Sequence, residues 1–191
     1  MSSLTDEQLM VAVRDGDASC LGDLFERHGE KLCGYLTRVT QDPELARDFV
    51  QEVFLRVLKY RGTYKDGNRF SSWMYTIANN VVNRHFGKKS TGATVINIED
   101  VATMIESREP SPFKQAVAAE EQRLLKAAFA ELPVEKREIL TLGMIERMPY
   151  KQVAEVLGVS ESAVKVRVHR AVKELRAVYM RLANEEENHG S

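Results

Sequence analysis

The chain has 191 residues, a hydrophobic fraction of 43% and a net charge of −1, because 27 basic residues nearly balance 28 acidic ones. This length allows one domain or two small ones, and the apolar content is sufficient for compact cores. No run of about 18 apolar residues is present, and the N-terminus lacks the pattern of a signal peptide, so we expect a cytoplasmic protein without a membrane span.

Apolar residues recur with the period of an α-helix along nearly the whole chain, and no segment has a convincing strand pattern. The expected helices are, in chain order, one capped by Thr5, one over about 18–39, one opened by Pro43, one over 70–86, one over 114–130, one from Pro133 to about 146, and a final pair after Pro149. The sequence therefore predicts an all-α protein.

The helix after Pro43 buries one apolar stripe and turns a polar face outward. That outer face carries Asp48, Gln51, Glu52 and, in its middle, the apolar Leu55. An exposed leucine flanked by charge favours a protein-binding surface, but single exposed leucines are also common on monomers. The pattern leaves both interpretations open.

The helix over 70–86 carries an unusual set of residues on the side opposite its apolar stripe. The expected outer face consists of Ser72, Tyr75, Thr76, Asn79, Asn80, Asn83 and Phe86. Asparagine is a poor helix former, and solvent-facing positions are more often Glu or Lys. Amides can bind base edges and rings can stack on unpaired bases, while nearby Lys and Arg residues hold the backbone. Trp73 lies on the apolar stripe and is expected to fill the core.

Helical periodicity fades between 88 and 113, where two prolines, a glycine and an acidic patch occur. These features predict a flexible linker between two small helical domains. The expected division is 1–90 for the first domain, 91–113 for the linker, 114–183 for the second domain and 184–191 for an acidic tail.

Residues 150–176 have the pattern of a helix-turn-helix. Gly158 follows a short amphipathic run, where a helix ends on a residue that tolerates positive φ, and Ser160 is a good N-cap for the next helix. The second helix buries a stripe that includes Val164 and Val168. Its other side is expected to face DNA and carries Ser162, Lys165, Val166, Arg167, His169, Arg170 and Lys173.

Charge is concentrated in two places, although the total is near zero. Residues 61–89 contain six basic residues and one acidic residue, and a second basic stretch covers 160–182. Two basic stretches in an otherwise acidic chain predict two phosphate-contacting surfaces.

Cys20 and Cys33 are the only cysteines, and on one continuous helix they would lie roughly 20 Å apart, too far for a disulfide. We expect two reduced thiols. His28 near Cys33 has no further ligand pair at metal-binding spacing, so neither a metal site nor any other cofactor is expected.

Taken together, these segments resemble an extracytoplasmic-function sigma factor, the compact bacterial class that carries only regions two and four of the sigma architecture. Residues 48–54 are similar to region 2.2, 70–80 to regions 2.3 and 2.4, and 132–139 with 150–176 to region 4. The resemblance covers almost the whole chain. It implies promoter recognition without catalysis, with core RNA polymerase, promoter DNA and a cognate anti-sigma factor as partners.

Position by position, the resemblance implies three surfaces. Asp48, Gln51, Glu52 and Leu55 would dock on the clamp helices of the polymerase largest subunit. Asn80 and the 64–69 loop, with Tyr64, Lys65, Asn68 and Arg69, would capture a flipped base of the minus-ten element, with Asn83 and Arg84 nearby on the helix that also bears Tyr75 and Asn79. Lys165, Val166, His169 and Arg170 would enter the major groove at the minus-thirty-five element, with Tyr150 and Arg167 as phosphate or structural contacts.

From the residues themselves, we expect Val166 to touch a thymine methyl and Arg170 or Lys165 to read a guanine. Two other classes of protein are alternatives. A helix-turn-helix regulator acting without polymerase would need a ligand pocket or a phosphoacceptor domain at the N-terminus, and residues 1–90 show neither pattern. An enzyme would need a phosphate loop, a metal-ligand set or a nucleophile with its base, and none stands out.

Overall fold

The computed structural model describes residues 4–87 and 112–189, and the side chains within 4–87 and 120–186. Its helices are α1 (Asp6–Asp15), α2 (Cys20–Thr40), α3 (Pro43–Lys59), α4 (Phe70–His85), α5 (Pro112–Glu131), α6 (Val134–Leu140), α7 (Tyr150–Leu157) and α8 (Glu161–His189). A short 3₁₀ turn covers Arg61–Thr63 and a π-helical turn covers Thr141–Ile145. The described part contains no strand, which confirms the all-α prediction.

The helix starts follow from local chemistry. The Thr5 hydroxyl accepts a hydrogen bond from the Gln8 N–H at 3.2 Å, and the Gln8 side chain accepts one from the Thr5 N–H at 2.8 Å. This capping box satisfies two backbone donors that a helix start leaves without partners. The Asp42 carboxylate caps α3 in a similar way, and Pro43 occupies its first turn.

The first domain is a bundle of α1 to α4. Helix α2 packs along α3, α3 packs against α4, and α1 closes one end. The buried side chains include Leu24, Tyr35, Phe49 and Phe70, which form the centre of the bundle. Burial of such large side chains is the main force that holds four short helices together.

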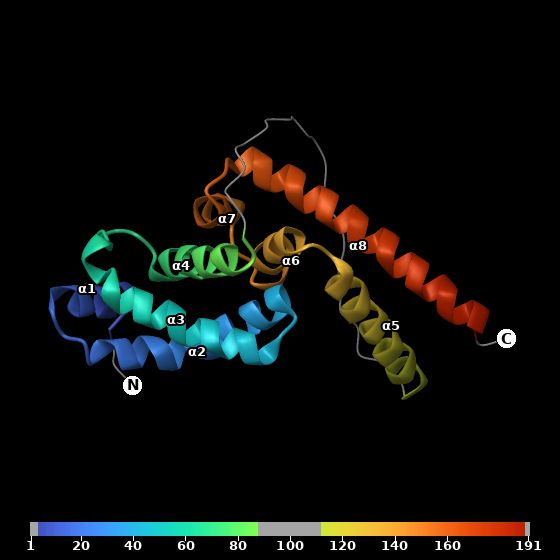
Figure 1. Cartoon of the computed structure of the whole chain (residues 1–191), viewed down its shortest axis with the longest axis horizontal. Coiled ribbons are helices and arrows are strands. Elements are labelled where there is room, and N and C mark those ends of the chain that lie inside the picture. The colour runs from blue at the N-terminus through green and yellow to red at the C-terminus, as the bar shows by residue number, and fades with distance from the viewer. Residues whose placement is uncertain (1–3, 88–111, 190–191) are drawn as a thin grey trace.

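The second domain contains α5 to α8. Helices α5 and α8 pack side by side and project away from the rest of the molecule (Figure 1). Arg123 pairs with Glu186, and Arg181 pairs with Glu131, between these two helices. Helix α8 continues to His189, so residues 184–189, which the sequence suggested as part of an acidic tail, extend this helix.

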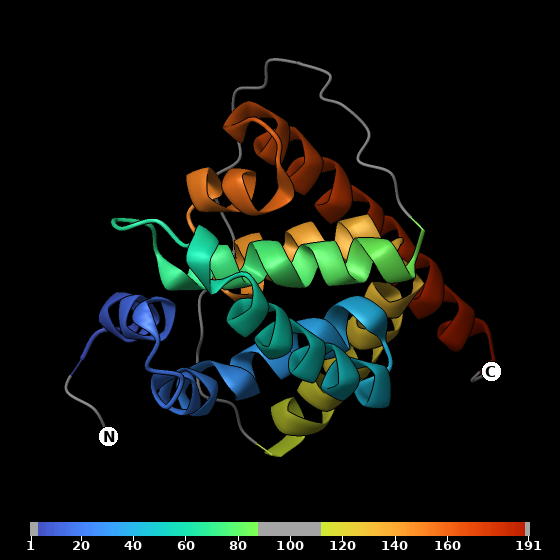
Figure 2. The ribbon, with the colours of Figure 1, turned by 60° about the vertical axis from the view of Figure 1, so that its left-hand side comes forward.

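The two domains pack directly on each other. Helix α4 of the first domain lies against α7 of the second, and the C-terminal end of α2 lies against α6. Figures 1 and 2 both show α4 between the first-domain bundle and the α7–α8 pair. The buried apolar residues of both domains form one continuous cluster. We call this contact between the two domains the seam. The position of α4 in the seam decides which of the predicted DNA-binding residues reach solvent.

Candidate nucleic-acid interface

The outer face of α3 is open to solvent. Leu55 is 67% exposed, and Asp48 and Gln51 beside it are exposed as well. Glu52 accepts a hydrogen bond from the Arg56 guanidinium at 2.6 Å, and its carboxylate lies 3.7 Å from Arg84 of α4. The exposed Leu55 thus lies beside exposed polar side chains and the Glu52–Arg56 ion pair.

The face of α4 that the sequence predicted to be outward is largely closed. Ser72, Tyr75 and Asn79 are buried, so the expectation of their exposure was wrong; Asn80 is exposed and Asn83 is partly buried. Helix α7 packs on this face, and Tyr75 is covered by Tyr35 of α2 and by Glu146. The periodicity of α4 correctly distinguishes its apolar stripe from its polar side, but it carries no information about a helix more than 60 residues away.

Asn79 makes a specific contact across the seam. Its side-chain amide donates to the backbone carbonyl of Val156 in α7 at 3.2 Å, and its oxygen accepts from the Asn83 side chain at 3.0 Å. Val156 is itself buried. A buried carbonyl needs a hydrogen-bond partner, and Asn79 supplies one to the other domain.

Tyr75 is held in the same seam. Its ring packs edge-on against Tyr35 with centroids 5.1 Å apart, and its hydroxyl donates to the Glu146 carboxylate at 3.5 Å. Burial, followed by the negative charge of Glu146, raises the pKa of Tyr75 well above its usual range. The hydroxyl therefore remains a neutral donor. Trp73 is half-buried against Tyr64, in agreement with a packing role.

The 64–69 loop has a buried anchor and exposed polar residues. Tyr64 is 2% exposed, and its hydroxyl donates to the backbone carbonyl of Asn68. Arg14 of α1 pairs with Asp66 at 2.5 Å and fixes the loop from the other side. Lys65, Asn68 and Arg69 are exposed. Tyr64 cannot offer its ring to a base in this conformation, because the loop closes over it.

The helix-turn-helix forms as the sequence predicted. Gly158 ends α7 with φ 64°, a left-handed conformation that favours glycine, and the Ser160 hydroxyl accepts the N–H of Ala163 at 3.2 Å. Tyr150 at the start of α7 is partly buried. The exposed residues of the predicted reading face are Ser162, Lys165, Arg167, His169, Arg170 and Lys173.

Val166 is the exception on that face, because it is only 6% exposed. The sequence placed it at the centre of the reading surface, and that placement was wrong for this conformation. Ala163, Val164 and Val168 are buried too, so the first turns of α8 are enclosed on more than one side. An interpretation of helical periodicity that assigns one buried stripe to a helix does not predict burial on a second side.

A cleft of about 530 Å³ separates the polar side of α4 from α8, the second helix of the helix-turn-helix. Asn80 and Asn83 line it from the first domain, and Arg167 and Arg170 line it from the second. Residues that the sequence assigned to two different promoter elements thus face one shared cleft.

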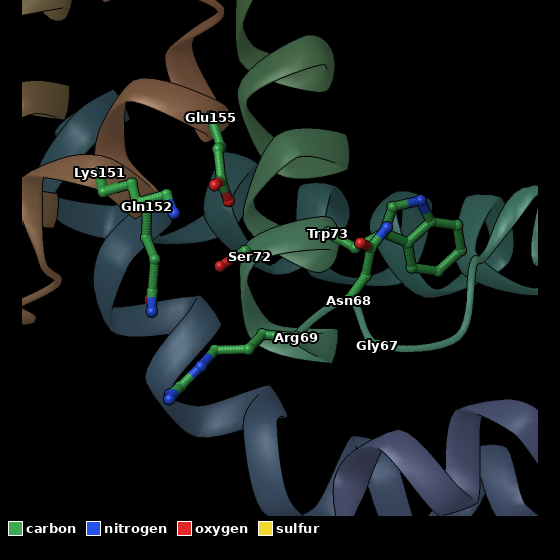
Figure 3. A pocket seen from close by; sticks show the side chains of 8 residues that line it. All are labelled: Gly67, Asn68, Arg69, Ser72, Trp73, Lys151, Gln152 and Glu155. Atoms are coloured by element: carbon green, nitrogen blue, oxygen red, sulfur yellow. The ribbon is translucent and has the colours of Figure 1, made fainter. Parts of the chain in front are cut away.

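A second hollow of about 530 Å³ lies between the 64–69 loop and the start of α7 (Figure 3). Arg69 and Ser72 line it from the first domain, and Gln152 and Glu155 line it from the second. The Ser72 hydroxyl is buried and has no hydrogen-bond partner among the described residues. Part of the predicted minus-ten surface is therefore covered by α7.

Three residues between the domains were not recognised as functional or structural candidates from the sequence. Arg137 is 8% exposed and donates through Nε to the backbone carbonyl of Val39 at 2.8 Å. Burial lowers the pKa of Arg137 below its usual range. Glu138 lies 3.5 Å from the hydroxyl of Tyr35, and Glu146 lies 3.5 Å from Arg38. A buried charge in a short charged segment looks like an ordinary surface residue in the sequence.

The remaining candidate residues are the two cysteines and His28. Both thiols are free, and His28 pairs with Asp6 at 2.7 Å and packs against the Phe70 ring. Among the described residues, no group of three or more His, Cys, Asp or Glu side chains could hold a metal ion. No helix in this part of the chain is both long and apolar enough to cross a membrane.

Comparison with known families identifies the class of protein. Residues 24–91 match the family described as Sigma-70 region 2, and residues 122–175 match Sigma-70, region 4. The two matches correspond to the two domains, and the second ends within the reading helix. The fold and the two family matches thus define a two-domain factor of the Sigma-70 type.

Curated relatives are similar over most of their length. The chain is 31% identical to RNA polymerase sigma factor CarQ of Myxococcus xanthus, over 87% of this chain and 93% of that protein. It is 26% identical to the ECF RNA polymerase sigma factor SigM of Bacillus subtilis, over 87% of this chain and 99% of that protein. The chain belongs to the extracytoplasmic-function group of RNA polymerase sigma factors. Sigma factors are transcription initiation factors that direct RNA polymerase to promoters.

Solved structures share the fold. CnrH in complex with the cytosolic domain of CnrY aligns with a TM-score of 0.64 at 21% identity, over 91% of this chain and 96% of that one. The sigma factor RpoE of Bartonella quintana, in complex with the anti-sigma factor NepR, aligns with a TM-score of 0.57 at 18% identity, over 82% and 94%.

Proposed function

We propose that this sigma factor uses three separate surfaces to start transcription in the cytoplasm. Asp48, Gln51, Glu52 and Leu55 on α3 dock on core polymerase. The 64–69 loop with Asn80, Asn83 and Arg84 engages the minus-ten element, with Tyr75 and Asn79 joining it when α7 moves away. The exposed polar face of α8 reads the minus-thirty-five element in the major groove.

The observation that carries the proposal is the reading face of α8. A helix that follows a helix-turn-helix turn exposes Lys165, His169 and Arg170 together on one side. Arginine and lysine bind phosphates and guanine edges, and nothing in a solvated helix demands that they share a face. The relatives are named RNA polymerase sigma factors, which supports polymerase as a partner, and we assign its docking to the first domain.

Reconstituted transcription tests the proposal. The purified chain is mixed with core polymerase, and the holoenzyme selects promoters from a randomised DNA pool before run-off transcription. We expect start sites downstream of two recurring elements, dependent on the added chain. DNA binding that needs no polymerase, together with no association with core enzyme, would favour a free-standing helix-turn-helix regulator instead.

We further propose an anti-sigma factor as a partner. RpoE, which shares this fold, was solved in complex with the anti-sigma factor NepR. The exposed apolar side chains of this chain, among them Leu55 and Met180, give such a protein places to bind. Co-purification from the native host should yield a protein that suppresses run-off transcription when it is added back. A partner that binds without suppressing transcription would refute this role.

A further inference from the structure

Helix α1 lies outside both family matches, because the region 2 match begins at residue 24. None of its residues belongs to the polymerase or DNA surfaces proposed above. The helix nevertheless has a firm place in the first domain, since Leu9 and Met10 are completely buried. Its start is tied to α2, because Asp6 pairs with Arg27 at 2.9 Å. A helix held in this way can support the segments that its remaining side chains contact.

Two residues of α1 contact the loop that leads into α4. Glu7 and Arg14 are seven residues apart, nearly two helical turns, so they lie on the same face of α1. Arg14 donates through one guanidinium nitrogen to the Asp66 carboxylate at 2.5 Å and to the backbone carbonyl of Tyr64 at 3.5 Å. Glu7 accepts the backbone N–H of Phe70 at 3.4 Å. The two side chains thus contact both ends of the loop, and all of these contacts lie within the first domain.

The contact of Glu7 supplies a cap that the start of α4 lacks locally. Arg69 occupies the N-cap position of α4 and forms no side-chain cap hydrogen bond. The first N–H groups of a helix have no partner within the helix, and a carboxylate beside them is favourable because the helix dipole is positive there. Glu7 therefore helps to fix the residue at which the loop ends and α4 begins.

The contact of Arg14 affects the charge of the loop as well as its shape. Asp66 is the only acidic residue in the basic stretch 61–89. Without a partner it would repel the phosphates that the neighbouring Lys65 attracts, and pairing with Arg14 offsets that repulsion. Gly67 follows with φ 84°, a left-handed conformation that favours glycine. The chain therefore turns immediately after the residue that Arg14 holds.

We propose that α1 positions the 64–69 loop for the minus-ten element, with Arg14 and Glu7 as positioning residues. This inference rests on the proposed function of the loop and assigns part of it to a helix outside the DNA surface. A loop that is held before DNA arrives need not be ordered on binding, so less of the contact energy is lost when a base is captured. Exposed ion pairs contribute little to the stability of a fold. The effect is therefore expected on base capture more than on stability.

Arg14→Ala in the reconstituted holoenzyme tests the proposal. Association with core polymerase and selection of the minus-thirty-five element should match the wild type, because the α3 and α8 faces are unchanged. Promoter opening should be roughly three- to tenfold slower, the range expected for the loss of one hydrogen bond. Base substitutions in the minus-ten element should cost the variant less than the wild type, since a looser loop discriminates less. The reactivity of unpaired thymines with permanganate measures opening on each promoter.

Two further changes show whether Arg14 acts through the loop. The double variant Arg14→Ala/Asp66→Ala should open promoters faster than Arg14→Ala alone, because no unpaired carboxylate remains in the loop. Its preference at the minus-ten element should stay weakened, because the loop is still not held. Arg14→Lys keeps the charge but not the planar fork that also reaches Asp15, so it should restore opening only in part.

Glu7 provides an independent test from the other end of the loop. Glu7→Ala should slow opening and weaken minus-ten preference in the same way as Arg14→Ala. Glu7→Gln keeps an oxygen that can accept the Phe70 N–H, so it should lose less than Glu7→Ala in both measurements. This pair of variants decides the matter if Arg14→Ala does not fold.

Arg181→Ala is the matched control. Arg181 also lies outside both family matches and also pairs with one carboxylate nearby and one on a distant helix, those of Glu185 and Glu131. The variant loses the same charge, but its partners lie in the second domain. Opening and minus-ten preference should stay at their wild-type values. Circular dichroism and thermal melting verify that each variant is folded.

The proposal is refuted if Arg14→Ala and Glu7→Ala open promoters at the wild-type rate, or if they slow opening without changing minus-ten preference. It is also refuted if Arg14→Lys restores opening fully while Arg14→Ala reduces the salt slope of DNA binding by about 1, because Arg14 would then be a phosphate contact. Failure of the proposed function is a different result, since the wild-type holoenzyme would then open no promoter.

Discussion

The outer face of α3 and the polar face of α4 belong to the same four-helix domain but differ in what covers them. Leu55 on α3 is 67% exposed, whereas Tyr75 and Asn79 on α4 are 5% and 7% exposed. Both faces carry residues that are atypical of a solvated helix. The outer face of α3 is open around Leu55, and only Arg84 of α4 reaches its edge, at Glu52. The face of α4 is closed because α7 packs on it.

This difference indicates an order of events in the proposed function. An open face can bind its partner at once, while a closed face must first lose the contacts that cover it. Polymerase would therefore bind α3 before promoter DNA reaches α4 and α8. Binding energy from polymerase or DNA that favours the open state then shifts the population of the chain.

Leu55→Asp, on the open outer face of α3, should have the largest effect. A charge at the centre of the exposed patch should weaken binding to core polymerase by about 2–4 kcal/mol, or roughly 30- to 1,000-fold. Biosensor titration with core enzyme measures the loss. Leu4→Asp, at another exposed leucine, should bind normally. Equal losses in both variants would show that general surface charge, and not the α3 face, decides the interaction.

Arg170→Ala, on α8 across the cleft from α4, should have a smaller effect on promoter binding. We expect a loss of about 1–3 kcal/mol at one base pair of the minus-thirty-five element, because arginine reads guanine with two hydrogen bonds. Competition among single-base variants of the promoter, bound by holoenzyme, provides the measurement. A uniform loss across all variants would make Arg170 a phosphate contact and would leave the identity of the base reader open.

Val166→Ala distinguishes a packing role from a reading role. Removal of buried carbon from a side chain that is 6% exposed should lower stability by about 1.6 kcal/mol and Tm by roughly 3–6 °C. Val172→Ala, at an exposed valine of the same helix, should change stability by less than about 0.5 kcal/mol. An unchanged Tm combined with a changed preference at a thymine would instead support the methyl contact that the sequence suggested.

Local signals in the sequence were sufficient for much of this structure. Thr5, Pro43, Gly158 and Ser160 each begin or end a helix as predicted, because capping depends on neighbours within a few residues. The exposure of Leu55 was correctly expected from the stripe on α3. These features require no knowledge of distant parts of the chain.

The seam could not be predicted in the same way. Burial of Asn79 and Tyr75 depends on α7 and on Glu146, which are far away in the sequence. Arg137 appears in a charged run, and only the fold reveals that it is buried. Two faces that each look ready for a partner can cover each other, and composition does not distinguish this case from exposure.

Tyr64→Phe should have the smallest effect. It tests the 64–69 loop, which lies in the sequence between α3 and α4. Loss of the hydrogen bond to the Asn68 carbonyl should cost about 1 kcal/mol at neutral pH and loosen the 64–69 loop. Because the ring is buried in the folded chain, promoter opening should fall only as far as the loop loosens. A large loss of opening at unchanged stability would restore Tyr64 as a direct base contact.

The effect of Tyr64→Phe on stability should also depend on pH. Burial raises the pKa of Tyr64 to about 12, above its usual value of 10, so folding favours the protonated phenol. The stability that Tyr64 contributes is fully present below pH 10 and declines as pH rises through 12, because the unfolded chain releases its proton first. Urea unfolding at pH 8 and pH 11 should therefore show a stability gap between wild type and Tyr64→Phe that narrows at high pH. A gap that stays constant would mean that the Tyr64 hydroxyl reaches water, and that the loop is as open as the α3 face.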